Sequence, residues 1–132
     1  MPIRYRDGYL YQLAEDYSID LVIQPETDVS DDFIRFDTNG KLTILKGYEW
    51  DGPSGQTFDT KDFMRGSLVH DVLYQLIRRG LIKDCRAEAD DILRMICLQD
   101  GMSQARAEMV HNAVRAFGAS AAENAKPILT AP

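Results

Sequence analysis

Cysteine is scarce in this sequence, and long apolar runs and clusters of basic residues do not occur in it. The 132 residues include only Cys85 and Cys97, too few for the disulfide framework of a small secreted domain. Both lie in a stretch that is predicted to be one helix, and a helix over that separation spans about 18 Å, which excludes a disulfide. We therefore expect free thiols and a reducing compartment.

The sequence also lacks segments of the kind that target or cross a membrane. Residues 1–7 do not contain the apolar run of a signal peptide. No stretch approaches the roughly 20 consecutive apolar residues of a membrane span. We therefore expect a cytoplasmic protein without a transmembrane segment.

The net charge of −6 comes almost entirely from the first half of the chain. Residues 1–60 contain 12 acidic and 5 basic residues, whereas residues 61–132 contain 9 acidic and 10 basic residues. An acidic surface repels phosphate backbones and anionic lipids, and no basic stripe with interleaved aromatic residues is present. We therefore expect no nucleic-acid ligand, and the acidic half suits contact with a protein partner.

Short β-prone runs dominate the first half. They lie at 9–13, 19–23, 33–36 and 41–45. The last two flank Asn39-Gly40, the strongest short-range signal for a β-hairpin. The acidic segment 27–32 precedes these two runs. It is most simply a solvated loop, although clustered carboxylates also suit a hard cation.

The second half has the periodicity of three helices. The first carries an apolar stripe and ends at Arg79-Gly80, the second begins near Asp84 and ends at Asp100-Gly101, and Ser103 is placed to cap the third. The third is expected to face inward with Val110, Ala113, Val114 and Phe117.

Strands followed by helices indicate the α+β class, and the chain length fits one domain over residues 1–132. We expect N-terminal antiparallel β-hairpins that form a sheet packed against three C-terminal α-helices. The expected parts are a β-rich half at 1–49, a glycine-rich turn at 50–62, a three-helix half at 63–118 and a tail at 119–132.

Residues that suit catalysis gather where the two halves meet. Residues 47–55 contain closely spaced glycines and a proline, and such an irregular backbone directs several carbonyl groups to one point. On the next helix, His70 and Tyr74 share one face and Asp71 lies on the adjoining flank. The short connection to the second helix favours antiparallel packing, which brings Asp90 or Asp91 near His70.

These residue types suit water activation at an ester or amide. A carboxylate on the imidazole of His70 fixes its tautomer and stabilises the imidazolium that forms when His70 acts as a general base. A divalent ion held by Asp71 and the turn carbonyls would polarise the substrate carbonyl. The sequence thus predicts a metal-assisted hydrolytic site.

Each of these residues also has a structural interpretation. His70 would be a helix residue satisfied by a backbone carbonyl, and Tyr74 would be a core aromatic with a satisfied hydroxyl. Asp90 would pair with Arg86 and Arg94, one helical turn away in either direction. The sequence leaves both interpretations open.

The glycine-rich turn, the helical His-Asp pair, the Tyr one turn later and the acid on the next helix resemble the arrangement of phospholipase A2. In that family, loop carbonyls and the Asp bind calcium, the His activates water, and a second Asp and the Tyr orient it. The resemblance implies that His70 is the base, supported by Tyr74 and by Asp90 or Asp91. It implies a calcium site formed by Asp71 and the carbonyls of Trp50, Gly52 and Ser54.

A second resemblance covers most of the chain. Residues 46–55, residues 64–76, and Arg86 with Ala89-Asp90 follow one another as in the phage-associated domain-of-unknown-function family 1353. It implies a bacteriophage or prophage source, and a location in the host cytoplasm or the virion. Our leading expectation is a phage-encoded metal-assisted hydrolase, with calcium the best-suited ion. The alternative is a non-enzymatic virion component or inhibitor of host defence that binds a virion or host protein and uses the motif structurally.

Overall fold

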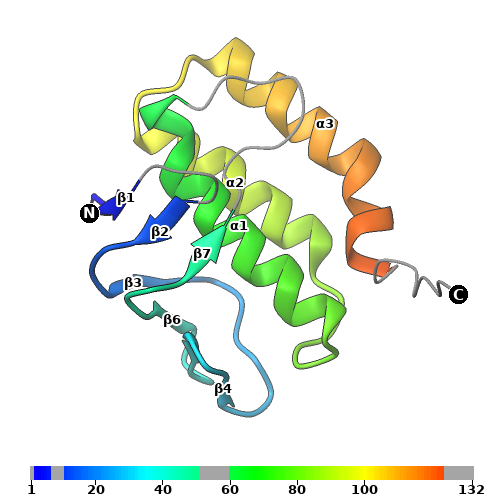
Figure 1. Cartoon of the computed structure of the whole chain (residues 1–132). Coiled ribbons are helices and arrows are strands. Elements are labelled where there is room, and N and C mark those ends of the chain that lie inside the picture. The colour runs from blue at the N-terminus through cyan, green and yellow to red at the C-terminus, as the bar shows by residue number, and fades with distance from the viewer. Residues whose placement is uncertain (1, 7–10, 51–59, 124–132) are drawn as a thin grey trace, which may run out of the picture.

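The computed structural model describes residues 2–6, 11–50 and 60–123, in which short strands precede three long helices (Figure 1). The strands are β1 (Tyr5–Arg6), β2 (Tyr11–Leu13), β3 (Tyr17–Asp20), β4 (Val29–Ser30), β5 (Ile34–Phe36), β6 (Lys41–Ile44) and β7 (Glu49–Trp50). The helices are α1 (Lys61–Arg78), α2 (Arg86–Gln99) and α3 (Gln104–Glu123). This order confirms the predicted α+β class.

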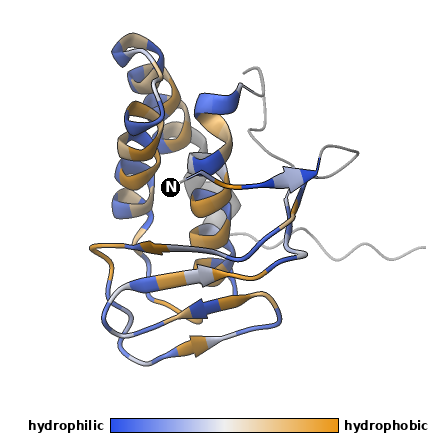
Figure 2. Ribbon diagram, turned by 90° about the vertical axis from the view of Figure 1, so that its left-hand side faces the viewer, coloured by the Kyte–Doolittle hydropathy of each residue, from blue (hydrophilic) through white to orange (hydrophobic). Residues whose placement is uncertain are grey.

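The strands form two antiparallel sheets. One has the order β1-β2-β7 and the other the order β3-β6-β5-β4. Figure 2 shows the four-stranded sheet beneath the helices. Strands β2 and β7 of the other sheet lie higher, beside the helices (Figure 1).

The hairpin predicted at Asn39-Gly40 is confirmed. Strands β5 and β6 pair with Phe36 opposite Leu42, and Gly40 closes the turn with a φ of 93°, a conformation that costs side-chain-bearing residues energy. A Cβ atom on Gly40 would also lie 2.4 Å from the carbonyl oxygen of Leu21. Glycine is thus required here by both backbone conformation and space.

The acidic segment that the sequence predicts as a loop is partly a strand. Val29–Ser30 forms the edge strand β4, because Val29 buries its side chain to 7% exposure while pairing with β5. The residue after this strand, Asp31, forms an ion pair with Arg79, which follows the last residue of α1. The segment therefore joins the sheet to a helix instead of remaining a solvated connection.

Helix α1 is the centre of the molecule. The larger apolar core is formed by α1, α2 and the strands. A smaller core lies where α1, α2 and α3 meet. A Cβ atom on Gly66 would lie 2.9 Å from Leu93 Cδ1 and 3.0 Å from Cys97 Sγ, so glycine permits the close approach of α1 and α2. The buried residues of α1 are Phe63, Met64, Arg65, Gly66, Ser67, Leu68, Val69, Val72, Leu73, Tyr74 and Leu76.

A buried guanidinium joins the N-terminal end of α1 to the C-terminal end of α2. Arg65 is only 7% exposed, and its Nε and Nη2 atoms donate to the two carboxylate oxygens of Asp100 at 3.0 and 3.1 Å. Nη2 also donates to Gln99 Oε1, and Nη1 donates to the Tyr17 hydroxyl. Bidentate pairing of this kind has a defined geometry, so Arg65 fixes the positions of α1, α2 and β3 relative to one another.

Helix α3 begins where the sequence predicts but ends later than expected. Ser103 caps it as expected, because its Oγ accepts a backbone N–H at 3.2 Å. Val110 is buried as expected, but Ala113 is exposed, and the Phe117 side chain lies outside the described residues. The helix continues past residue 118, where a tail was expected, because the alanine-rich segment 119–122 favours helix.

Both thiols are free, as the sequence predicts, and both are buried. Cys85 occupies the N-cap of α2 and Cys97 lies within that helix. Among the helices that the structure describes, none is long and apolar enough to span a bilayer.

Candidate functional site

One buried carboxylate gathers side chains from all three helices. His70 on α1 places Nε2 2.7 Å from Oδ1 of Asp90 on α2. The Tyr74 hydroxyl donates to the same oxygen at 2.7 Å, and Nη1 of Arg115 on α3 donates to Oδ2 at 2.8 Å. We call these four residues the Asp90 cluster.

The helical repeat explains why two of these residues meet. His70 and Tyr74 are four residues apart, so they lie one above the other on α1. Their ring centroids are 4.2 Å apart at an interplanar angle of 34°. Because α1 and α2 run antiparallel, both rings face the first turns of α2, where Asp90 lies.

Burial and hydrogen bonding oppose each other at Asp90, whose exposure is 0%. Burial alone would raise the pKa of its carboxyl group, but the hydrogen bonds from His70 and Tyr74, with the charges of His70 and Arg115, leave that pKa lower than usual. Burial and Asp90 together raise the pKa of Tyr74. Tyr74 is therefore a hydrogen-bond donor to an ionised Asp90.

The hydrogen-bond partner of His70 determines which nitrogen of its imidazole carries the proton. An ionised carboxylate only accepts hydrogen bonds, so Nε2 carries the proton and Nδ1 has a free lone pair in the neutral ring. Within the described residues, Nδ1 has no hydrogen-bond partner. The His70 side chain is 15% exposed, so the ring is held by the core without being sealed in it.

The adjacent acid, Asp91, faces away from His70. Its side chain is 60% exposed and accepts from His111 Nε2 on α3 at 2.8 Å. Arg94 Nη2 lies 3.8 Å from the same carboxylate oxygen. Of the two acids that the sequence offers, only Asp90 joins His70, whereas Asp91 pairs with His111.

The structural interpretation of Asp90 as a helix-surface residue is not what the contacts show. Arg86 binds Asp84, with Nη2 and Oδ2 2.8 Å apart, and Arg94 binds Glu108, with Nη1 and Oε1 3.1 Å apart. Asp90 instead points inward.

Asp71, the expected metal ligand, lies on the next flank of α1 and is half-buried. The Tyr48 hydroxyl is 3.0 Å from Asp71 Oδ2 and 2.8 Å from Gln75 Oε1. Burial and the charge of Asp71 raise the pKa of Tyr48, so this phenol stays protonated. Tyr48 was not among the site residues predicted from the sequence, although it lies in the glycine-rich segment 47–55.

Of the three residues that were expected to supply carbonyl ligands, Trp50 is the one that the structure describes. Gly52 and Ser54 lie outside the described residues. Trp50 is 2% exposed, and its Nε1 donates to Ser67 Oγ at 3.2 Å, which fixes the start of the turn one helical turn before His70.

Asp71 has the donor chemistry for calcium but does not make a site alone. Calcium takes six to eight oxygen ligands, of which one carboxylate supplies at most two. Among the residues that the structure describes, no group of three or more His, Cys, Asp or Glu side chains is arranged to hold a metal ion. The remaining ligands of a calcium ion would have to be backbone carbonyl groups, other side-chain oxygens or water.

Arg115 is the member of the Asp90 cluster that the sequence analysis missed. Its side chain is 45% exposed, and it reaches Asp90 from a helix whose polar face looks like an ordinary solvated surface. No spacing rule connects it to His70, because the two lie on helices that pack together only in the tertiary structure.

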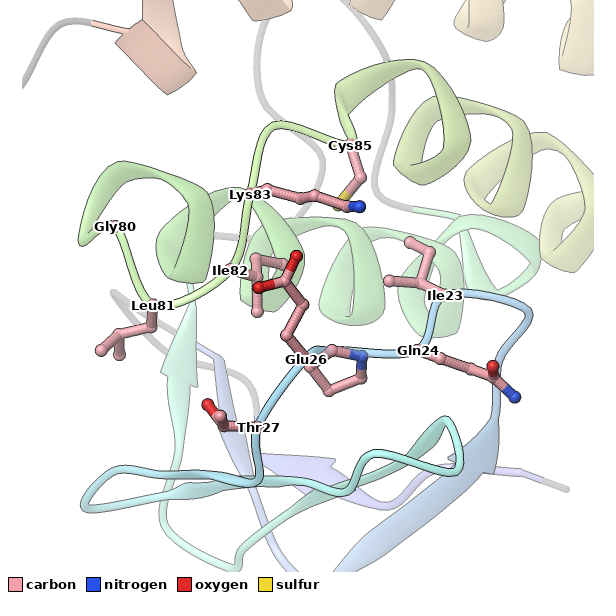
Figure 3. Close-up of a pocket in the computed structure, with 10 residues that line it drawn as sticks. Ile23, Gln24, Glu26, Thr27, Gly80, Leu81, Ile82, Lys83 and Cys85 are labelled. Atoms are coloured by element: carbon pink, nitrogen blue, oxygen red, sulfur yellow. The ribbon is translucent and has the colours of Figure 1, made fainter.

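A cavity of about 330 Å³ lies apart from the Asp90 cluster, between the connection after β3 and the connection from α1 to α2 (Figure 3). Its lining shares no residue with the cluster. It is lined by Ile23, Gln24, Pro25, Glu26, Thr27, Gly80, Leu81, Ile82, Lys83 and Cys85.

No protein-family model, curated protein or solved structure matches the chain. Functional inference therefore starts from the Asp90 cluster and Asp71.

Proposed function

We propose that the chain is a metal-assisted hydrolase of an ester or amide, in which His70 is the general base. The observation that carries the proposal is the buried carboxylate of Asp90, 2.7 Å from Nε2 of a partly exposed imidazole. An orienting carboxylate behind an imidazole is the arrangement by which hydrolases activate water.

Three residues of the cluster, His70, Tyr74 and Asp90, have defined tasks in this proposal. Asp90 accepts the Nε2–H of His70, so Nδ1 receives the proton of the attacking water. The carboxylate then stabilises the imidazolium, and Tyr74 keeps Oδ1 directed at the ring. When the leaving group departs, His70 returns the proton from Nδ1.

Asp71 is the residue that would hold a divalent ion, together with the backbone carbonyls of Trp50, Gly52 and Ser54. Such an ion would polarise the substrate carbonyl and stabilise the oxyanion. Tyr48 supports this role because its hydroxyl fixes the Asp71 carboxylate from the sheet side.

The chain contains its own control for a test of the base. His111 and Asp91 form a second His-Asp pair at 2.8 Å, against 2.7 Å for His70 and Asp90, but its acid is exposed. Hydrolysis of a panel of fatty-acyl and aryl esters is measured with calcium for His70→Gln, Asp90→Asn, His111→Gln and Asp91→Asn. The first two should lose about 10²–10⁴-fold in kcat, and the last two should match the wild type.

Thermal melting in a calcium titration tests the metal separately. At a hundred times its dissociation constant, a bound ion stabilises the folded state by about 2.7 kcal/mol. Asp71→Asn should abolish this stabilisation. Asp31→Asn should not, because Asp31 follows β4 and pairs with Arg79 at the C-terminal end of α1. If calcium, magnesium, manganese and zinc all leave the melting temperature unchanged, the metal has no part in the function.

A non-enzymatic role is the second candidate, and one observation favours it. Both oxygens of Asp90 are satisfied by side chains from α1 and α3, so the cluster would also serve as a clasp between helices. In this case the chain is a phage protein that acts by binding a virion or host protein. No ester hydrolysis, together with strong destabilisation by Asp90→Asn, would favour this role.

A further inference from the structure

We propose that Arg115 is a positioning residue of the hydrolytic site, so that α3 completes a site otherwise built by α1 and α2. The inference rests on the proposed function of His70. It adds a residue that reaches neither the water nor the substrate and acts on His70 through Asp90.

The division of labour between the two oxygens of Asp90 supports this role. Oδ1 receives both His70 and Tyr74, whereas Oδ2 receives Arg115 at 2.8 Å. Within the described part of the chain, Oδ2 has no other partner. Without Arg115 the carboxylate would be held against rotation about its Cβ–Cγ bond only by the two contacts at Oδ1, so its alignment with the imidazole N–H would be less strictly fixed.

The charge of Arg115 supports the same role. Asp90 is fully buried, and an unpaired buried carboxylate is strongly destabilised relative to its protonated form. The guanidinium compensates that charge and contributes to the lowered pKa of Asp90. An ionised Asp90 is the form that accepts the Nε2–H and stabilises the imidazolium.

Helix α3 supplies a matched control. Arg106 lies on the same helix and also binds α1, because its Nη1 donates to Thr60 Oγ1 at 2.7 Å and to Asp62 Oδ1 at 3.1 Å. A residue that only docks α3 should therefore behave like Arg106. A residue that positions Asp90 should not.

The experiment compares Arg115→Gln, Arg115→Lys and Arg106→Gln in the full chain. Steady-state kinetics on the best ester should show that Arg115→Gln lowers kcat by about 10–100-fold, the usual effect of removing a partner of an active-site ligand, with KM within about twofold. Arg115→Lys should recover part of the loss, and Arg106→Gln should keep the wild-type kcat.

Nuclear magnetic resonance gives a readout that does not need turnover. Because Nε2–H of His70 is bound to a buried carboxylate, its proton should exchange slowly with water. Arg115→Gln should speed that exchange at least tenfold, and Arg106→Gln should leave it unchanged. The two histidines of the chain are assigned with His70→Gln and His111→Gln.

Two results would overturn the proposal. One is that Arg115→Gln leaves both kcat and the exchange of the His70 N–H at wild-type values. The other is that Arg106→Gln reproduces both effects, which would reduce Arg115 to a docking residue. A wild-type chain that hydrolyses neither the esters nor the corresponding amides refutes the proposed function, and the exchange measurement then still decides whether Arg115 positions Asp90 and His70.

Discussion

Replacing Asp90 by Asn should destabilise the fold far more than the same replacement at its neighbour Asp91. The two acids are adjacent on α2, but Asp90 is fully buried and the Asp91 side chain is 60% exposed. The chemical change is identical, so the difference between the two variants reports what burial and partners contribute.

The structure sets the expected size of that difference. In Asp90→Asn the amide oxygen still accepts from His70 and Tyr74, but the amide nitrogen then faces Nη1 of Arg115, and two donors meet. One hydrogen bond to a charged group is lost and two others become neutral, which costs about 2–4 kcal/mol. The cost stays below that of a fully buried broken pair because Arg115, 45% exposed, can turn to water. Asp91→Asn should cost at most about 1 kcal/mol.

Urea unfolding at neutral pH, followed by circular dichroism, measures both variants against the wild type. The urea dependence of the unfolding free energy should be the same in all three chains, because the surface exposed on unfolding is the same. The midpoint of Asp90→Asn should fall well below that of Asp91→Asn.

The pH dependence provides a second check with a defined sign. The folded pKa of Asp90 lies below its unfolded value of about 3.9. Its carboxylate therefore stabilises the fold fully above that value, and the stabilisation is lost as the pH falls through the folded pKa. The difference in unfolding free energy between the wild type and Asp90→Asn should accordingly become smaller at acidic pH. A gap that stays constant, or two variants that agree within about 0.5 kcal/mol at neutral pH, would refute this account of the cluster.

Three further predictions concern the packing. Gly66→Ala should cost about 0.5–2 kcal/mol in urea unfolding, because overpacking against Leu93 and Cys97 exceeds the gain in helix propensity. Burial raises the thiol pKa of Cys85 to about 11 and that of Cys97 to about 12, so dithionitrobenzoate at about pH 8 should label neither until the chain unfolds. Gly40→Ala should lower stability by about 1–3 kcal/mol in thermal melting, because its φ of 93° and a backbone carbonyl oxygen 2.4 Å away both oppose a methyl group.

The sequence predicted the helices and the hairpin because their signals are local. Glycine after the first helix, Ser103 before the third and Asn39-Gly40 in the hairpin each act within a few residues. The strand Val29–Ser30 was missed because it gains its stability from pairing with β5 and from the burial of Val29. That gain arises only in the tertiary structure.

The site follows the same division. His70 and Tyr74 share a face by helical geometry, so their pairing was predictable. The choice of Asp90 over Asp91 depends on the rotation of α2 against α1, which the sequence left open. Arg115 was not predictable, because its contact spans two helices and 25 positions of sequence.

Two consecutive residues of α2 each bind a histidine of a different neighbouring helix. Asp90 binds His70 of α1 and Asp91 binds His111 of α3, each over 20 positions of sequence. Successive helical residues differ by about 100° in direction, so one inserted or deleted residue early in α2 would leave one histidine facing the wrong acid and the other facing an apolar residue, Ala89 or Ile92. We therefore expect natural variants to change length in the connections and sheets, while the distance from the start of α2 to these two acids stays constant.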